Sequence, residues 1–216
     1  MIKLETMSDF FTARVEGYDE HMIANVEGCK EGYPKMASLI PKSTQRLLDL
    51  GCGTGLELDE IFKLFPDVSV TGIDLTDEML QKLREKHPNQ KMELICGDYF
   101  EVELGEKIYD CCISFETMHH FSHQQKIALY QRIKKALKDG GCYIECDYMV
   151  EEQEEEDRLF AENERLRKEQ GIPEGVICHF DTPCTIDNQV KMLATAGFEH
   201  TEQVFRIGCT TILVAR

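Results

Sequence analysis

The residues with the clearest chemical signature form a glycine-rich turn that follows an apolar run. Residues 47–50 read Leu-Leu-Asp-Leu, and Gly51, Gly53 and Gly55 come next in the pattern G-x-G-x-G. Glycines at such a turn let the backbone approach a ligand closely. Asp74 ends the following strand-like run, and a carboxylate at that place can accept both hydroxyls of a ribose. The pattern predicts a site for a nucleoside.

The spacing of the glycines distinguishes among nucleoside ligands. A dinucleotide fingerprint, G-x-G-x-x-G, would require a third glycine at position 56, where this chain has Leu56. The ligand is therefore expected to lack a pyrophosphate. A nicotinamide-dependent oxidoreductase is disfavoured for the same reason. It is also disfavoured because the chain ends in two strand-like runs, 199–207 and 209–215.

Several segments, in order along the chain, resemble the motifs of the class I S-adenosylmethionine-dependent methyltransferases. The turn at 49–55 is similar to their first motif, and Asp74 matches the acidic end of their second strand. Residues 95–98, 109–114 and 137–144 resemble their third motif, fourth strand and turn into the fifth strand. The resemblance implies S-adenosyl-L-methionine as cofactor and methyl transfer as activity.

The same resemblance implies a set of cofactor-binding residues. The glycine turn would pass under the methionine part and the ribose, and Asp49 would help to hold the amino group. Asp74 would bind the ribose diol, Asp98 would accept a hydrogen bond from the adenine amino group, and Leu75 would pack beside the adenine. The full set is Asp49, Gly51, Gly53, Gly55, Asp74, Leu75, Asp98, Tyr99, Ser114 and Phe115.

Four further side chains are candidates for chemistry at the methyl acceptor. His119 and His120 follow the fourth strand, where the mouth of the site is expected, and either can act as a base or wall of the pocket. His179 follows a polar insertion, and Tyr18 lies in a leading helix of the kind that folds over the cofactor in the resembling family. No H-x-x-E or C-x-x-C partner accompanies the histidines, so the sequence predicts no metal site.

Strand-like and helix-like segments alternate through the middle of the chain. This alternation predicts a Rossmann-like, doubly wound α/β fold with a mostly parallel seven-stranded sheet, a C-terminal antiparallel hairpin and a helical lid. The expected strands are 46–50, 68–73, 91–95, 109–114, 142–148, 199–207 and 209–215. The expected helices are a region over 8–40 that Pro34 and Pro41 end, then 55–64, 76–86, one opened by a capping box at Ser122 and closed by Gly140-Gly141, 151–170, and one from about 186 to Gly197.

The organisation is interpreted as a single methyltransferase domain over residues 1–216. Ligands bind at the carboxyl ends of parallel strands, so an insertion after strand five can also cover the acceptor site. The divisions are an N-terminal helical cap at 1–42, a cofactor-binding core at 43–147, a helical lid insertion at 148–183, and the last helix and hairpin at 184–216.

The net charge and the cysteine content limit the classes of partner and the compartment that we expect for the protein. The formal net charge of −16 opposes binding to nucleic acids, and no apolar run is long enough for a membrane span. The ten cysteines lie in a chain without an export signal, which predicts reduced thiols and a cytoplasmic protein. A small-molecule acceptor is the expected partner.

Other functions remain compatible with the sequence. The chain could bind S-adenosylmethionine without transferring its methyl group. It could also methylate a metalloid or a thiol, because such enzymes bring cysteines together in the acceptor pocket. However, Cys111, Cys112, Cys142 and Cys146 lie in strand-like runs, where free cysteines are expected to face the core as small apolar residues.

Overall fold

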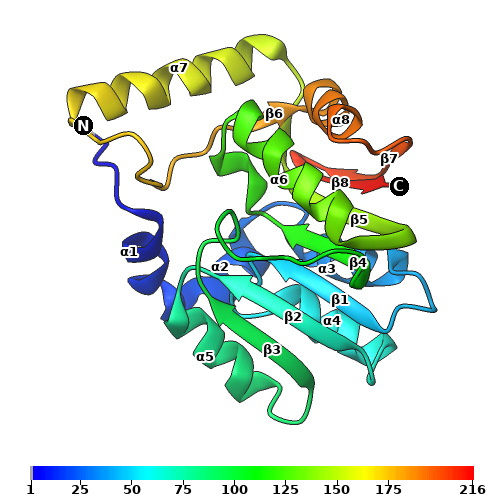
Figure 1. Cartoon of the computed structure of the whole chain (residues 1–216). Helices are drawn as coiled ribbons and strands as arrows, with labels where there is room; N and C mark the ends of the chain where they lie inside the picture. The colour runs from blue at the N-terminus through cyan, green and yellow to red at the C-terminus, as the bar shows by residue number, and fades with distance from the viewer. Residues whose placement is uncertain (1) are drawn as a thin grey trace.

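The computed structural model describes residues 2–216 and shows a central sheet between two layers of helices (Figure 1). The strands are β1 (Arg46–Leu50), β2 (Ser69–Asp74), β3 (Lys91–Cys96), β4 (Tyr109–Phe115), β5 (Leu137–Val150), β6 (Cys184–Thr185), β7 (Thr201–Ile207) and β8 (Thr210–Ala215). Their order across the sheet is β3-β2-β1-β4-β5-β8-β7, and β6 pairs with the end of β5.

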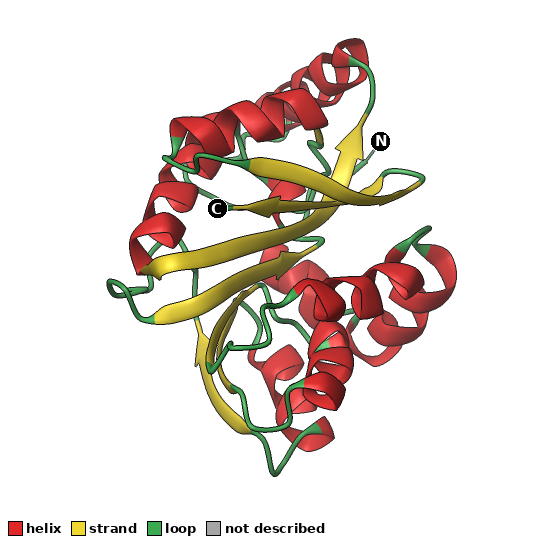
Figure 2. Cartoon of the chain, turned by 90° about the vertical axis from the view of Figure 1, so that its right-hand side faces the viewer, coloured by secondary structure: helices red, strands yellow, loops and turns green. Residues whose placement is uncertain are grey.

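Helices cover both faces of the sheet (Figures 1 and 2). They are α1 (Met7–Thr12), α2 (Tyr18–Asn25), α3 (Cys29–Leu39), α4 (Leu56–Leu64), α5 (Asp77–Lys86), α6 (His123–Ala136), α7 (Gln153–Glu169) and α8 (Ile186–Thr195), with 3₁₀ turns η1 (Val15–Gly17) and η2 (Met118–His120). Helices α3, α4 and α5 contribute to the core on one face, and α6 and α8 to the core on the other.

The topology confirms the predicted fold class. Strands β3, β2, β1, β4 and β5 are parallel to their neighbours, whereas β8 is antiparallel to both β5 and β7. The short strand β6 is an addition to the seven strands expected. Because the chain crosses from β3 at the edge back to β4 beside β1, the carboxyl ends of β1, β2 and β4 meet at the topological switch point, where open α/β sheets bind ligands.

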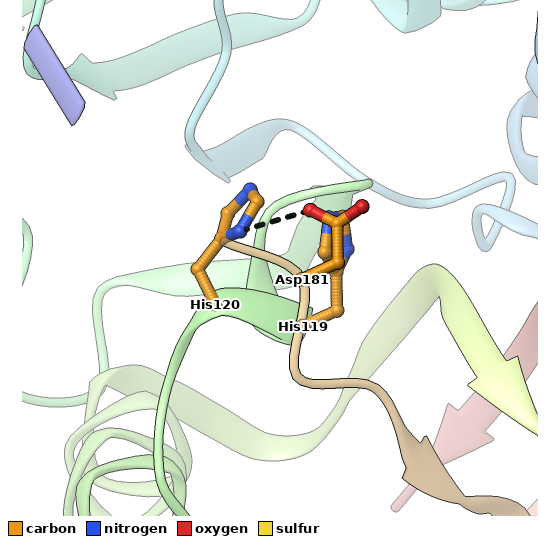
Figure 3. A group of neighbouring side chains, drawn as sticks. All are labelled: His119, His120 and Asp181. Atoms are coloured by element: carbon orange, nitrogen blue, oxygen red, sulfur yellow. Dashed lines mark ion pairs between the residues drawn. The ribbon is translucent and has the colours of Figure 1, made fainter. Parts of the chain in front are cut away.

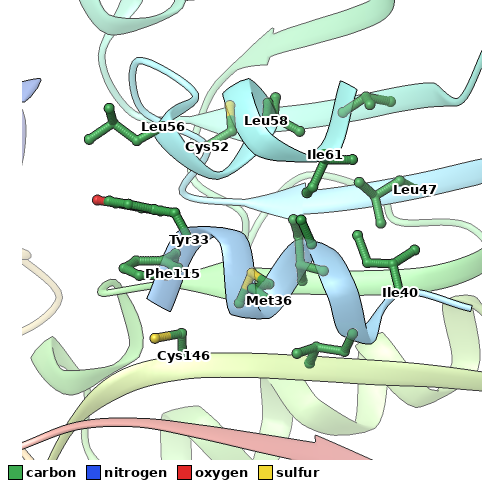
Figure 4. Close-up of a cluster of buried hydrophobic side chains, with 14 of the residues drawn as sticks. Tyr33, Met36, Ile40, Leu47, Cys52, Leu56, Leu58, Ile61, Phe115 and Cys146 are labelled. Atoms are coloured by element: carbon green, nitrogen blue, oxygen red, sulfur yellow. The ribbon is translucent and has the colours of Figure 1, made fainter. Parts of the chain in front are cut away.

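The two cores lie on opposite faces of the sheet because side chains alternate along each strand. Cys111 belongs to the cluster under α3 and α4, and its neighbour Cys112 belongs to the cluster under α6 and α8. In the first cluster Tyr33 stacks on Phe115 with ring centroids 4.1 Å apart (Figure 4). All ten cysteines are free, in agreement with the expectation of reduced thiols.

The N-terminal region differs from the continuous helical region expected over 8–40. It consists of α1, η1, α2 and α3, and Gly28 adopts a φ of 84° immediately before α3. Pro34 lies inside α3 rather than at its end. A proline within a helix removes one hydrogen bond. The buried side chains of Tyr33, Met36 and Ala37 on the same helix offset this cost.

The start of the fifth strand also differs from the prediction. Helix α6 ends at Ala136, and its capping box at Ser122 and Gln125 is confirmed, but Gly140-Gly141 lie within β5 instead of closing the helix. Leu137 already pairs with Tyr109, and the register then shifts before Cys142 pairs with Cys111. Gly140, with a φ of 79°, lies within the extra residues of β5 that cause this register shift.

The charged helix α7 is held by one buried carboxylate. Glu156 accepts hydrogen bonds from the backbone N–H of Thr185 at 2.5 Å and from the Asn188 side chain at 2.9 Å, and is nearly inaccessible to solvent. These bonds tie α7 to the start of α8. Across residues 2–216, no helix combines the length and the apolar character that crossing a membrane requires.

Candidate functional site

Each glycine of the turn between β1 and α4 is needed for a different structural reason. Gly51, Gly53 and Gly55 have φ values of 74°, 46° and 77°. A Cβ on Gly51 would lie 2.6 Å from Thr117 Oγ1, and one on Gly55 would lie 2.4 Å from Leu83 Cδ1. A Cβ on Gly53 would meet nothing closer than 3.9 Å, so at Gly53 the backbone borders open space.

Asp74 lies at the end of β2, beside this turn. Its Oδ2 accepts a hydrogen bond from the Gly53 N–H and its Oδ1 one from the Thr76 N–H, both at 2.9 Å. Burial raises the pKa of Asp74, while these backbone bonds oppose the shift. Each oxygen keeps a further lone pair. The carboxylate can therefore receive two hydroxyl groups, as the ribose prediction requires.

A small cavity of about 40 Å³ lies in front of Asp74. Its walls are Met7, Phe11, Gly51, Asp74, Leu75, Tyr99, Thr117, His120 and Phe121. The Tyr99 hydroxyl is 3.0 Å from Thr117 Oγ1. Ligand pockets typically measure about 300–1,000 Å³, so a nucleoside fits here only when α1, which supplies Met7 and Phe11, moves outward.

Asp49 forms a buried carboxyl pair with Glu57 behind the turn. Both oxygens of Asp49 and Oε1 of Glu57 are buried without a hydrogen-bond partner. Burial, together with the proximity of the two groups, raises the pKa of Asp49, and burial raises that of Glu57 to about 7. Unpartnered acceptors at this depth suit a cationic group such as the amino group of S-adenosylmethionine. The residues present thus fit the cofactor.

Six of the predicted cofactor residues do not line the small cavity: Asp49, Gly53, Gly55, Asp98, Ser114 and Phe115. The last three are engaged in other contacts. Asp98 Oδ1 accepts a hydrogen bond from the Phe100 N–H at 2.8 Å and closes the turn after β3. Ser114 is fully buried with its hydroxyl 2.6 Å from the Tyr143 hydroxyl, and Phe115 packs against Tyr33 in the core. Their proposed contacts with the cofactor therefore require a rearrangement that Leu75 and Tyr99 do not need.

A second, larger cavity of about 800 Å³ adjoins the small one. The four side chains predicted for acceptor chemistry, Tyr18, His119, His120 and His179, all contribute to its wall. Its other walls come from α1, η1, α2, Glu116, Tyr148, Asp181 and the hairpin residues Cys209 and Thr210. Phe11 and His120 line both cavities. From the insertion at 148–183, the wall takes Tyr148, His179 and Asp181, but no described residue of α7.

His119 is the most constrained side chain of the large cavity. Its Nδ1 lies 2.8 Å from Oδ1 of the buried Asp147 and 3.7 Å from Glu116 Oε2, and its Nε2 lies 3.6 Å from Asp181 Oδ1. Burial alone would lower the pKa of His119, but the surrounding carboxylates raise it to about 9. Burial and the neighbouring His119 and His179 lower the pKa of His120 well below its ordinary value.

Pairing between the N-terminus and the loop before β6 holds α1 over the cavities. Thr6 forms a β-bridge with Cys178, and the N–H of His179 donates to the Glu5 carbonyl at 3.0 Å. The His179 ring stacks on Phe10 with centroids 3.5 Å apart. This segment, rather than α7, therefore covers the large cavity.

Sequence reasoning missed three groups in this region. Glu116, Asp147 and Thr117 contact the predicted residues, yet none belongs to a recognisable motif. Glu116 has a φ of 48°. Positive φ values are rare for residues other than glycine, and such residues are often found at functional sites. Asp147 carried the only available signal, since it follows an apolar run in β5 near the carboxyl end of the strand.

Asp74→Ala is expected to weaken the binding of S-adenosylhomocysteine by about 1–3 kcal/mol, because the ribose hydroxyls lose a charged acceptor. Calorimetry measures the loss. Since Asp74 also bonds to Gly53 and Thr76, Asp74→Asn serves as a second variant that keeps one acceptor. Glu106→Ala, at an exposed ion pair, is the control. A loss of affinity no larger than that of Glu106→Ala would show that Asp74 does not bind the ribose.

Glu57→Gln is expected to stabilise the cofactor-free protein at alkaline pH by about 1–3 kcal/mol. The folded-state pKa of Glu57, about 7, exceeds its ordinary value of 4.5, so the parent loses stability as pH rises between these values. The difference should vanish below pH 4.5 and be complete above pH 7. Urea unfolding at several pH values measures it, with Glu60→Gln on the same helix as control. A pH-independent difference would contradict the buried pair.

The glycine turn and the acid that ends β2 lie together at the topological switch point, as the predicted nucleoside site requires. A family profile described as "Methyltransferase domain" matches residues 47–141. Malonyl-[acyl-carrier protein] O-methyltransferase of Priestia megaterium is 27% identical over 138 residues, which covers 63% of this chain and 50% of the relative. Carboxy-S-adenosyl-L-methionine synthase of Nautilia profundicola is 24% identical over 177 residues, 74% of this chain and 72% of the relative.

Solved structures share the fold. Human N-acetylserotonin methyltransferase in complex with S-adenosylmethionine superimposes with a TM-score of 0.65 at 20% identity, covering 96% of this chain and 54% of that one. The profile match and these relatives support a class I S-adenosylmethionine-dependent methyltransferase, a family whose cofactor is S-adenosyl-L-methionine. The chain spans half the length of the Priestia relative.

Proposed function

We propose that the protein transfers a methyl group from S-adenosylmethionine to a small molecule bound in the large cavity. One observation carries the proposal. The small cavity at Asp74 and the large cavity share Phe11 and His120 as walls, so a cofactor in the first presents its reactive end to the second. The cofactor residues themselves are proposed as predicted, with Asp74, the glycine turn, Leu75 and Tyr99 in the best positions.

The chain has to orient the two reactants and exclude water. Bound S-adenosylmethionine supplies a methyl group on a sulfonium, and its product leaves as a neutral thioether that needs no acid. The aromatic side chains of Phe10, Phe11 and Tyr18 close the large cavity from the N-terminal side. Enclosure of this kind fixes the line of attack and keeps water from competing.

The histidines handle the acceptor's proton. Where the acceptor is a hydroxyl, thiol or protonated amine, a base has to remove its proton during transfer. His120, whose pKa is lowered by burial, is neutral at physiological pH and is the base that this proposal favours. His119 is held by Asp147 on one nitrogen and faces Asp181 with the other. His179 and Tyr18 complete the wall around the acceptor.

The size of the large cavity and the net charge of the chain support a small acceptor. A volume of about 800 Å³ lies within the range of small-molecule sites. The net charge of −16 gives no footprint for a nucleic acid. A metalloid acceptor receives less support, because Cys209 is the single cysteine among the described residues that line this cavity.

A screen of small-molecule acceptors with the full chain tests the proposal. The readout is S-adenosylhomocysteine release above the rate without acceptor, beginning with hydroxylated, thiol and amine compounds that fit the cavity. We expect release with at least one class. Tight binding of S-adenosylhomocysteine without release for any acceptor would instead support a cofactor-binding protein without transferase activity.

A further inference from the structure

A group of potential metal ligands stands in the wall of the large cavity. His119, His120 and Asp181 each direct a ligand atom to one point, and these atoms lie within 4.8 Å of one another. Figure 3 shows the two imidazole rings and the carboxylate converging from η2 and from the loop before β6. The sequence disfavoured a metal because no H-x-x-E or C-x-x-C partner accompanies the histidines. Asp181 is 62 positions from His119 in the chain, and only the fold brings the three together.

The two distances from Asp181 are close to those between ligands of a tetrahedral ion. Asp181 Oδ1 lies 3.6 Å from His119 Nε2 and 3.5 Å from His120 Nδ1. Zinc–ligand bonds of about 2.0–2.1 Å place neighbouring tetrahedral ligands about 3.3–3.4 Å apart. His120 Nδ1 is also 3.3 Å from the Phe180 carbonyl oxygen, a long contact that an ion would replace. Small side-chain movements therefore suffice to complete the coordination.

The surroundings of His119 are those of a metal-binding histidine. Its Nδ1 bonds to the buried carboxylate of Asp147 at 2.8 Å, which leaves Nε2 to face Asp181 and the cavity. Metal-binding histidines almost always have such a partner on their other nitrogen, since it fixes the ring and raises its basicity. The Asp147 carboxylate lies behind the His119 ring, and its negative charge favours a cation.

We propose that His119, His120 and Asp181 bind a divalent transition-metal ion of the zinc type, with the fourth position open to the large cavity. Imidazole and carboxylate ligands suit such ions, and three protein ligands with one open position are typical of catalytic rather than structural sites. His179, with Nε2 3.9 Å from Asp181 Oδ1, borders the open position.

The metal site also restricts the chemical class of the methyl acceptor, an extension that rests on the proposed function. A molecule entering the fourth position has to offer a donor atom, so the acceptor class is small compounds with a hydroxyl, thiol or carboxylate group that coordinates the ion. In that case the ion lowers the pKa of the group that is methylated, and His120 is a metal ligand instead of the base. The metal site itself does not depend on this extension.

Metal binding by untagged full-length protein tests the inference. The protein is stripped with a chelator and titrated with Zn²⁺ in a calorimeter, without cofactor or acceptor. Cys209 lines the same cavity and is a competing zinc ligand, so all proteins carry Cys209→Ser. We expect one equivalent of Zn²⁺ to bind, and Asp181→Asn to weaken binding about 10- to 100-fold. Asp181 is 45% exposed, so this variant should fold, which thermal unfolding verifies.

Three further measurements sharpen the outcome. His120→Gln should also weaken binding, whereas His200→Gln, at an exposed histidine beyond α8, should not. Co²⁺ in the same protein should show the spectrum of nitrogen and oxygen ligands without thiolate bands. Absence of stoichiometric binding, thiolate bands, or equal affinity of Asp181→Asn and the parent would each overturn the metal site. Because none of these measurements uses methyl transfer, failure of the transferase proposal is seen separately, in the acceptor screen.

Discussion

Gly53→Val is expected to reduce the affinity for S-adenosylhomocysteine by about 100-fold or more, close to 3 kcal/mol. The backbone N–H of Gly53 bonds to Asp74, and a Cβ at this position would project into open space beside Tyr18. A branched side chain there would occupy the space in which the backbone meets the ligand. Isothermal calorimetry with the purified variant measures the loss.

The control for this variant is Gly140→Val. Gly140 also has a positive φ, 79°, but a Cβ there would meet no atom within 4 Å, and the residue lies in β5 near its start. Both variants carry the strain of a branched residue in the left-handed region, so their difference isolates the effect on the ligand. Unchanged affinity in a folded Gly53→Val protein would show that the cofactor binds elsewhere.

His119→Gln is expected to lower the turnover number by about 100-fold or more while leaving cofactor affinity nearly unchanged. His119 lines the large cavity but not the small one, and its ring is fixed between Asp147 and Asp181. Loss of this imidazole affects the acceptor whether it handles a proton or holds a metal ion. Turnover with the acceptor found by screening, together with calorimetry for S-adenosylhomocysteine, separates the two effects.

Asp147→Asn tests the same side chain through its partner. The replacement keeps the shape of the residue but removes the negative charge beside His119 Nδ1, one of the carboxylates that raise the pKa of His119. We expect turnover to fall and the pH profile of turnover to change, whereas His200→Gln should match the parent. If His119→Gln weakened cofactor binding as much as turnover, the division into a cofactor cavity and an acceptor cavity would be wrong.

Strand and helix positions in the centre of the chain were predictable because their signals are local. The apolar run at 46–50 is bounded by polar residues and glycines, and β1 occupies the predicted residues. The predicted cap at Ser122 depends on bonds to Gln125, three positions away, and is confirmed. Thr185 caps α8 in the same way, through the N–H of Asn188. The glycine turn and Asp74 are similarly local, since each directly follows or ends a strand.

The predictions that failed involve competition between local and long-range contacts. Pro34 was expected to end a helix, but the burial of Tyr33 and Met36 against the sheet outweighs the missing hydrogen bond. The face on which a strand residue lies is also decided by the sheet. Ser114 and Phe115 are adjacent in β4, so their side chains point to opposite faces of the sheet.

The sequence by itself determined the fold class, the nucleoside turn and the histidines at the carboxyl end of β4, because these features depend on residues close together in the chain. Only the tertiary structure decided which groups those histidines face. Asp147 reaches His119 through the parallel pairing of β4 and β5, and Asp181 reaches it because residues 5–7 pair with the loop that contains His179. Asp147 and Asp181 are 28 and 62 positions from His119 in the chain. Contacts over such separations follow from the packing of strands and loops, which no local pattern of residues encodes.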